Sequence, residues 1–170
     1  MLDQAQKIDS RDFDKLVTSL ISDDDLIRVI RGQLHIEHQL EEIIKAASAS
    51  KRAANALIKN KFQNKIDVVC ALGLSERLLS PLHALRDLRN DFAHKLKAEL
   101  TQKEARKFYD AFDKEETDLM KSLMTTLPKL QIQSSTIKPR NLAADELFTL
   151  CIITLRNALI AARLEVLENA

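Results

Sequence analysis

The sequence contains few of the residues that interrupt helices or fill β-sheets. Its 170 residues include only two glycines, three prolines, no tryptophan and 4% aromatic residues. A β-rich chain of this length needs many more turn-forming glycines and more aromatic strand residues. The chain is instead rich in Ala, Leu, Glu, Lys, Arg and Ile, and this composition favours an all-α fold.

The sequence also has almost no excess of one charge over the other, and it contains only two cysteines. The 26 basic and 25 acidic residues leave a formal net charge of +1, which does not indicate a nucleic-acid-binding protein. Cys70 and Cys151 each lie in an apolar run, which predicts buried, reduced thiols and no thiol-based metal site. The sequence contains no signal-peptide core and no run of ~18 uncharged residues for a membrane span. We therefore expect a cytoplasmic protein that contacts no membrane.

The length fits a single domain over residues 1–170, and 45% hydrophobic with 30% charged residues indicates a globular chain. Apolar residues at helical spacing predict helices over residues 10–21, 26–47, 62–72, 75–94, 101–124 and 143–167. Residues 46–60 predict a short helix or an exposed connection, and residues 131–140 predict a loop. The last helix is almost continuously apolar from Phe148 to Ile160, so we expect it at the centre of a five- to six-helix bundle.

Several residues mark the expected helix ends. Ser10 is the expected N-cap of the first helix, and Gly73 suits a left-handed C-cap. Thr101 followed three residues later by Glu104 predicts a capping box. Pro81 lies inside a helical pattern, so we expect either a helix that restarts there or a kink.

The segment that carries chemistry runs from Arg86 to His94. Arg89 is followed by Asn90 and, five positions on, by His94. A guanidinium grips a phosphate, and a histidine near neutral pKa moves the proton of a ribose 2′-hydroxyl or of a leaving oxygen. Asn90 suits a positioning role. Together these residues predict metal-independent RNA cleavage through a cyclic phosphate, with the 2′-hydroxyl of the substrate as the nucleophile.

Helix geometry limits this prediction. Residues five positions apart on a regular helix lie about 140° apart around its axis. Arg89 and His94 therefore face one cleft only if the end of the helix is distorted, or if a second subunit completes the site.

Two resemblances add to this reading. The stretch from Arg89 to His94 resembles the Arg-polar-x3-His signature of HEPN domains, which are dimerising helical bundles that often act as metal-independent ribonucleases. Residues 62–74 and 85–94 together resemble the mannitol operon repressor family of small helical transcriptional regulators, with weaker similarity over residues 32–44. The resemblance covers about a third of the chain. It implies a HEPN-like bundle, a homodimer, and regulation without an evident DNA-reading motif.

Three interpretations of Arg89 stay open. In the first, Arg89 forms an ion pair with Glu37 or Glu41 of a neighbouring helix, while Asn90 and His94 cap a helix end. In the second, Arg89 contacts phosphate without catalysis. In the third, Arg89, Asn90 and His94 form a working ribonuclease site.

A basic segment adds a second candidate surface. Residues 45–65 contain six cations and no acid, namely Lys45, Lys51, Arg52, Lys59, Lys61 and Lys65. With Arg86, Lys95 and Lys97, these residues predict either a patch for a phosphate backbone or an ordinary solvated edge.

Metal binding and DNA reading are less well supported. His38 has metal-ligand spacing to Glu41 and Glu42, but no second motif of this kind follows, so we expect no metal and no cofactor. The turn at residues 71–75 has no following helix with base-reading polar residues at its start. We therefore expect a regulator that acts through a protein partner or RNA, without sequence-specific DNA binding, and keep the HEPN-type endoribonuclease as the alternative.

Overall fold

The computed structural model describes residues 13–94, 99–126 and 138–168, and within these ranges every regular element is helical. Residues 13–20 are helical, so the first predicted helix is present, although Ser10 lies outside the described residues. The elements that follow are α2 (Asp25–Ala47), α3 (Lys51–Leu57), α4 (Phe62–Ala71), η1 (Glu76–Leu78), α5 (Leu79–His94), α6 (Gln102–Tyr109), α7 (Lys114–Thr126), η3 (Pro139–Asn141) and α8 (Ala144–Glu168). The predicted all-α bundle is confirmed, but the described residues form eight α-helices and not the predicted five or six.

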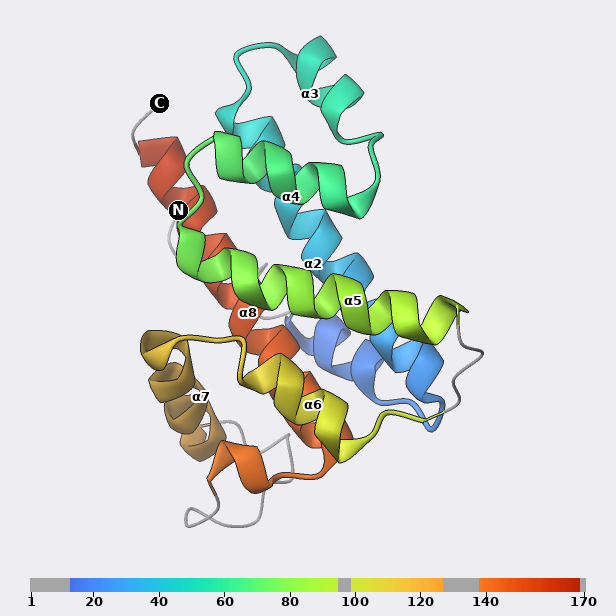
Figure 1. Ribbon diagram of the computed structural model, residues 1–170. Helices are drawn as coiled ribbons and strands as arrows, with labels where there is room; N and C mark the ends of the chain where they lie inside the picture. Colours follow the sequence, from blue (N-terminus) through green and yellow to red (C-terminus); the bar gives the residue numbers. More distant parts are fainter. Residues whose placement is uncertain (1–12, 95–98, 127–137, 169–170) are drawn as a thin grey trace.

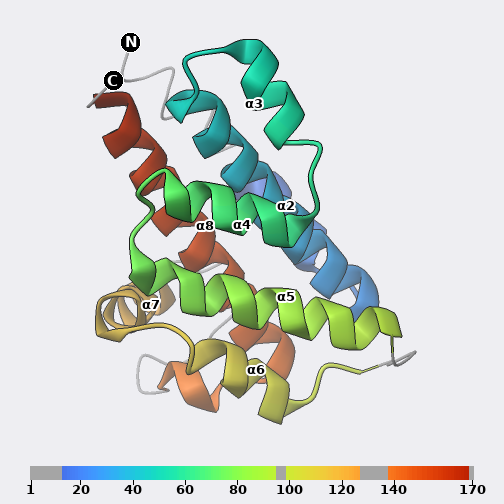
Figure 2. The ribbon, with the colours of Figure 1, turned by 45° about the horizontal axis from the view of Figure 1, so that its top comes forward.

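The two longest helices, α2 and α8, lie side by side and form the centre of the bundle (Figure 1). Helices α4 and α5 pack against one face of α2, and α6 packs on both α5 and α8. Helix α7 packs against the N-terminal half of α8, and α3 extends beyond α2 and α4 at one end (Figure 2). Helix α5 therefore lies at the surface, with one side buried and the other exposed.

Helix α8 is the core helix, as its apolar sequence predicts. Eleven of its residues are buried, and Phe148, Ile152 and Ile153 have no exposed surface. Within the described ranges it is also the one helix long and apolar enough to cross a membrane by length and composition, and 56% of that apolar window is buried in the fold. Burial among the other helices accounts for its unbroken apolar character.

Local capping sets several helix ends, and those at Gly73 and Thr101 lie where the sequence predicts them. The Asp24 side chain accepts the amide of Ile27 at the start of α2, at 3.1 Å. Thr101 and Glu104 form the reciprocal capping box at the start of α6. Gly73 follows α4 with a φ of 96°, the left-handed conformation that favours glycine at a helix end.

The helix restarts next to Pro81, as one of the two alternatives predicts. A 3₁₀ turn, η1, precedes α5, and Pro81 is the third residue of α5. Amides of the first helical turn have no partner within the helix, so the missing N–H of proline costs no hydrogen bond there.

The prediction of a single helix over residues 101–124 is wrong, because the helix is interrupted between α6 and α7. The Asp113 carboxylate accepts the amides of Glu115 at 2.9 Å and Glu116 at 3.2 Å, so it acts as the N-cap of α7. The break keeps Phe108 and Phe112 in the core, with ring centroids 5.5 Å apart.

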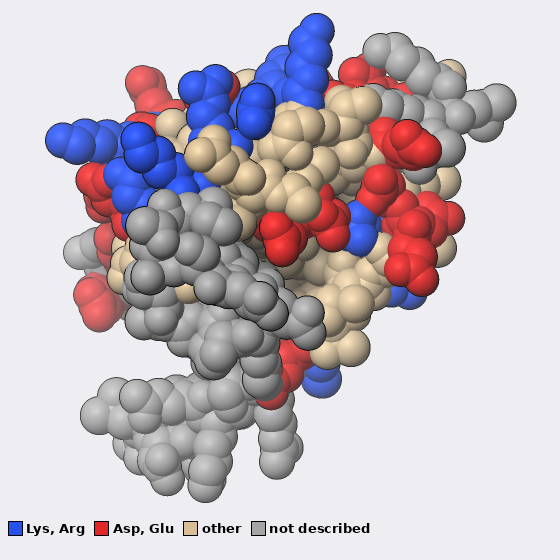
Figure 3. All heavy atoms as spheres, turned by 90° about the horizontal axis from the view of Figure 1, so that it is seen from below, with Lys and Arg blue, Asp and Glu red and all other residues tan. Residues whose placement is uncertain are grey.

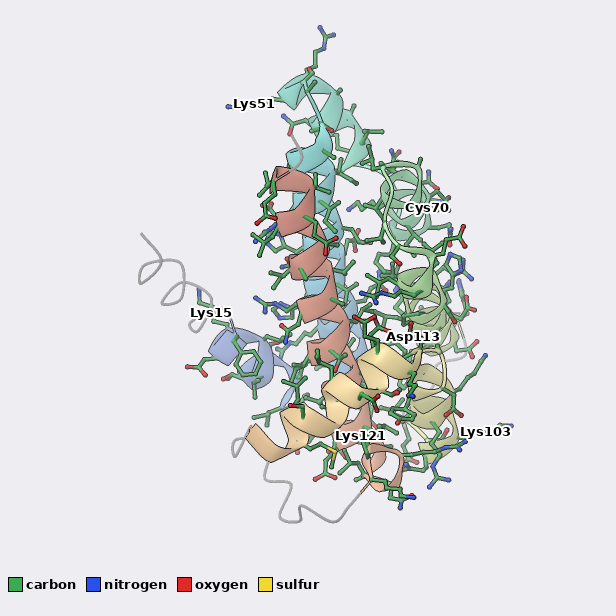
Figure 4. All side chains as sticks on the ribbon, turned by 90° about the vertical axis from the view of Figure 1, so that its left-hand side faces the viewer. Lys15, Lys51, Cys70, Lys103, Asp113 and Lys121 are labelled. Atoms are coloured by element: carbon green, nitrogen blue, oxygen red, sulfur yellow. The ribbon has the colours of Figure 1, made fainter. Side chains whose placement is uncertain are left out.

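The prediction for the two cysteines is half right. Cys151 is fully buried in α8, and burial raises the pKa of its thiol well above the ordinary value. Cys70 is exposed on α4 (Figure 4), so its predicted burial is wrong. The buried side of α4 consists of Phe62, Lys65, Ile66 and Val69, and Cys70 follows Val69 by about 100° around the helix.

Candidate functional site on helix α5

Helix α5 carries the three predicted site residues on its last two turns. Its buried side consists of Pro81, Leu82, Leu85, Leu88 and Phe92, which anchor it to the bundle. Arg89 and Asn90 are half-buried beside this apolar side, and His94 is exposed at the last helical residue.

Helix α5 is uninterrupted from Leu79 to His94. The distorted helix end that would bring Arg89 and His94 together in one chain is therefore not present. Their side chains leave the helix about 140° apart. Two hollows are lined by described residues: one lies between α6 and η3, and the other between α2, α4 and α8. Neither hollow is lined by Arg89 or His94.

The guanidinium of Arg89 contacts its neighbour instead of a carboxylate. Arg89 Nη1 donates a hydrogen bond to Asn90 Oδ1 at 3.3 Å. The ion pairs among the described residues do not include Arg89. A half-buried guanidinium without a carboxylate partner keeps most of its donors for an anion such as phosphate.

The predicted ion pair between Arg89 and Glu37 or Glu41 is wrong, because both glutamates bind another cation. The ammonium of Lys65 on α4 donates to Glu37 Oε1 at 2.6 Å and also to Glu41 Oε1. Glu37 therefore ties α2 to α4 and does not orient Arg89. The first interpretation of Arg89 loses its proposed partner.

Lys65 is the buried member of this cluster, with 4% of its surface exposed. Burial by itself lowers the pKa of the Lys65 ammonium, but hydrogen bonds and the negative charges of Glu37 and Glu41 raise it above the ordinary value. Lys65 remains charged as a fixed structural cation.

Arg86 is also engaged within the fold. Its Nε donates to Asp87 Oδ1 at 2.8 Å, and its Nη1 donates to Gln63 on α4. These contacts position Arg86 between α4 and α5, so its role beside Arg89 is to hold α5 in place.

The predicted basic segment does not form one continuous patch. Lys51, Arg52, Lys59 and Lys61 are exposed on or next to α3 and α4. Lys65 is buried, Lys45 pairs with Glu42 at 2.8 Å, and Lys95 and Lys97 lie outside the described residues.

A basic hollow that was not predicted from the sequence lies between α6 and η3. Lys103, Arg106 and Lys107 of α6 line it together with Arg140 of η3. The spacing of residues 103, 106 and 107 on a capped helix is a sequence signal for one basic helix face. Nothing in the sequence indicates that Arg140, more than thirty residues away, joins them.

The part of the chain that the structure describes contains no cluster of side chains suited to bind a metal ion. Within those ranges no group of three histidine, cysteine, aspartate or glutamate side chains is placed to hold an ion. His38 and Glu41 share α2, but Glu41 is bound to Lys65.

No protein-family description matches the chain, and no curated protein or solved structure matches it.

Proposed function

We propose that the chain is a helical regulatory protein of the kind that its resemblance to mannitol operon repressors implies. It acts through contacts with a protein partner or RNA and does not read DNA sequence. The proposal places Arg89 as a phosphate or carboxylate contact, Asn90 as the residue that positions it, and His94 as an exposed neighbour without a catalytic role.

The observation that carries this proposal is the regularity of α5. One uninterrupted helix separates Arg89 from His94 by about 140°, so one chain does not present both to the same phosphodiester. General acid–base catalysis requires the imidazole within hydrogen-bonding reach of the proton that it moves, at about 3 Å. A guanidinium that binds an anion by itself needs no such convergence.

The start of α5 supports the proposal that DNA sequence is not read. A recognition helix presents polar side chains from its first turns to base edges in the major groove. In α5 the first four residues are Leu79, Ser80, Pro81 and Leu82, and both Pro81 and Leu82 are buried. This helix start contributes to the core instead.

The test is binding of RNA by the folded protein and by Arg89→Gln. The variant should bind a single-stranded RNA oligonucleotide more weakly, while Arg52→Gln, which removes an exposed cation from α3, should bind like the parent. Fluorescence anisotropy with labelled RNA measures both. Equal binding by Arg89→Gln and the parent would remove Arg89 from the RNA contact.

A HEPN-type, metal-independent endoribonuclease is the second candidate. The exposure of His94 and the absence of a carboxylate partner for Arg89 in the described residues favour it. In this candidate His94 moves protons while the 2′-oxygen attacks phosphorus and the 5′-oxygen leaves, and Arg89 clamps the phosphate. The geometry then requires Arg89 of one copy beside His94 of another. A mixture of Arg89→Ala and His94→Ala would regain cleavage that neither variant has alone.

We propose a homodimer for either candidate, as the resemblance implies. Ile27, Ile30 and Leu34 of α2 are 41%, 37% and 56% exposed, and their spacing places them on one side of that helix. A second copy covering this side would remove apolar surface from water. Leu34→Lys should therefore shift the sedimentation coefficient from dimer to monomer, and an unchanged dimer would exclude this face.

A further inference from the structure

The hollow between α6 and η3 concentrates positive charge in a chain that is almost neutral overall. It has a volume of about 480 Å³ and is lined by Gln102, Lys103, Arg106, Lys107, Asp110, Ala111 and Arg140. Four of these seven are cations and one is an acid, whereas the whole chain has a net charge of only +1. Figure 3, seen from the end where α6 and η3 lie, shows a group of Lys and Arg side chains at the upper left, while Asp and Glu side chains lie both beside this group and on the right.

The contacts across the hollow hold its two walls together. Gln102 Nε2 donates to the carbonyl of Leu142 at 2.9 Å, and Arg106 Nε donates to the carbonyl of Arg140 at 3.3 Å. Pro139 and Leu142 are buried on either side of Arg140. The position of Arg140 opposite α6 is therefore fixed by the fold.

Asp110 compensates only one of the four cations. Its carboxylate accepts from Arg140 Nη2 at 3.0 Å. Arg106 uses Nε for the carbonyl of Arg140, which leaves the two terminal nitrogens of its guanidinium for a ligand. Lys103 and Lys107 are exposed, and no ion pair of the described residues includes them.

This arrangement opposes helix stability. Like charges three and four positions apart on a helix destabilise it by roughly 0.2–0.5 kcal/mol per pair. Lys103 forms such pairs with both Arg106 and Lys107. An anionic ligand in the hollow relieves this repulsion.

The geometry points to a nucleic-acid phosphate backbone as the ligand of this hollow. Several separated cations on an open surface match the regularly spaced charges of a polyanion. An arginine with free terminal nitrogens can also donate two parallel hydrogen bonds to one phosphate. No aromatic side chain lines the hollow, so bases are not stacked there and the contact is independent of sequence. Small-molecule sites, by contrast, enclose most of the ligand, whereas this hollow is shallow and open.

The inference deepens the proposed function by naming where RNA would bind, and it rests on that function only for its preference for RNA. It uses residues of α6 and η3 and none of α5. An anionic membrane is the competing partner, but the one aliphatic residue of the lining is the half-buried Ala111, so the hollow offers no large apolar side chain to enter a bilayer.

The experiment compares two double variants that remove the same number of charges. Lys103→Gln with Lys107→Gln removes two of the three cations that α6 contributes to the hollow, and Lys51→Gln with Arg52→Gln is the matched control on α3. Figure 4 shows Lys51 and Lys103 at opposite ends of the molecule. Anisotropy is measured over a salt series with a single-stranded 2′-O-methyl RNA, which cannot be cleaved through its 2′-oxygen, and with DNA of the same sequence. Circular dichroism confirms that both variants fold.

The hollow variant should bind about tenfold more weakly at about 50 mM salt, and the slope of log K against log salt should decrease by about 1.4 for two lost phosphate contacts. The control should stay within about twofold of the parent. Asp110→Asn should tighten binding, because it removes the one carboxylate of the hollow and releases Arg140. Binding of both nucleic acids identifies the backbone as the ligand, and binding of RNA alone assigns RNA as its source.

Equal losses in the two double variants would overturn the inference, as would absent binding by the parent protein. Binding of phosphatidylserine vesicles in place of nucleic acid would also overturn it. If Arg89→Gln binds like the parent while the hollow variant is weakened, the α5 contact fails and this inference stands. The reverse pattern rejects the hollow and retains the α5 contact.

Discussion

The ammonium of Lys65 lies 2.6 Å from Oε1 of Glu37 and joins α4 to α2 beneath the surface of the bundle. The Lys65 side chain is 5% exposed, and Glu41 accepts a second hydrogen bond from it. Removing one partner of a buried ion pair leaves an uncompensated charge, whereas exposed pairs contribute little. Lys65 should therefore be one of the more sensitive charged positions of the fold.

Lys65→Met should lower the free energy of unfolding by about 3 kcal/mol, because two carboxylates then lose their cation. Lys61→Met, at the exposed N-cap of the same helix, should change it by less than about 0.5 kcal/mol. Urea denaturation followed by circular dichroism measures both. Equal stability of the two variants would mean that the Lys65 cluster contributes nothing to the fold.

The exposed Asp113 and the buried Glu116, at the start of α7, form a second polar contact. Burial raises the pKa of the Glu116 carboxyl, and Asp113 raises it further. The hydrogen bond from Glu116 lowers the pKa of Asp113. Glu116 is 4% exposed, and its Oε1 lies 3.2 Å from Arg77 Nε.

This arrangement predicts a specific dependence of stability on pH. The folded state holds the Glu116 proton more tightly than the unfolded chain, whose pKa takes the ordinary value of 4.5. The stabilising effect of that proton is complete below pH 4.5 and is lost as the pH rises through the raised pKa of the folded state. The opposite holds for Asp113, whose lowered pKa stabilises the fold above its ordinary value of 3.8.

In Glu116→Gln, the side-chain amide replaces the protonated carboxyl as a hydrogen-bond donor and does not titrate. The stability of this variant relative to the parent should therefore increase as the pH rises above about 4.5. Unfolding measured at a series of pH values between about 4 and 7 tests this difference. Parallel stability curves for the two proteins would show that Glu116 titrates normally.

Gly32 allows the close approach of α2 and α8. A Cβ at this position would lie 2.9 Å from Phe148 Cζ and 3.1 Å from Ile152, and both side chains are fully buried. Gly32→Ala should therefore destabilise the fold by about 1–3 kcal/mol, although alanine is the better helix former.

The Phe148→Leu substitution tests whether contact with Phe148 is the cause. In the background of Phe148→Leu, Gly32→Ala should cost less than it does alone, because the shorter side chain makes room for the methyl group. Thermal unfolding of the single and double variants gives the coupling. Additive effects would assign the cost of Gly32→Ala to a different contact.

Much of the helical architecture follows from the sequence. Periodic apolar residues locate α2, α4, α5 and α8, and local chemistry places Gly73 after α4 and the capping box at Thr101. These features depend on residues within a few positions of one another, so the sequence displays them directly. The apolar spacing continues across Asp113 and masks the interruption there, although aspartate followed three residues later by Glu116 is a helix-start signal.

The candidate site could be predicted only in part. The positions of Arg89, Asn90 and His94 on one helix were correct, but the partner of Glu37 was not. A lysine on the apolar side of α4 is read as a surface residue unless the pair of glutamates on α2 is known to face it. The hollow between α6 and η3 likewise depends on a contact between distant segments, which periodicity does not reveal.

The central claim is that α5 presents Arg89 as a binding group and not as half of a nuclease. The most direct measurement incubates the purified protein at high concentration with structured and single-stranded RNA in EDTA, beside His94→Ala. Intact RNA in both reactions is the predicted result. Cleavage that survives chelation and disappears in His94→Ala would contradict the claim and establish the ribonuclease.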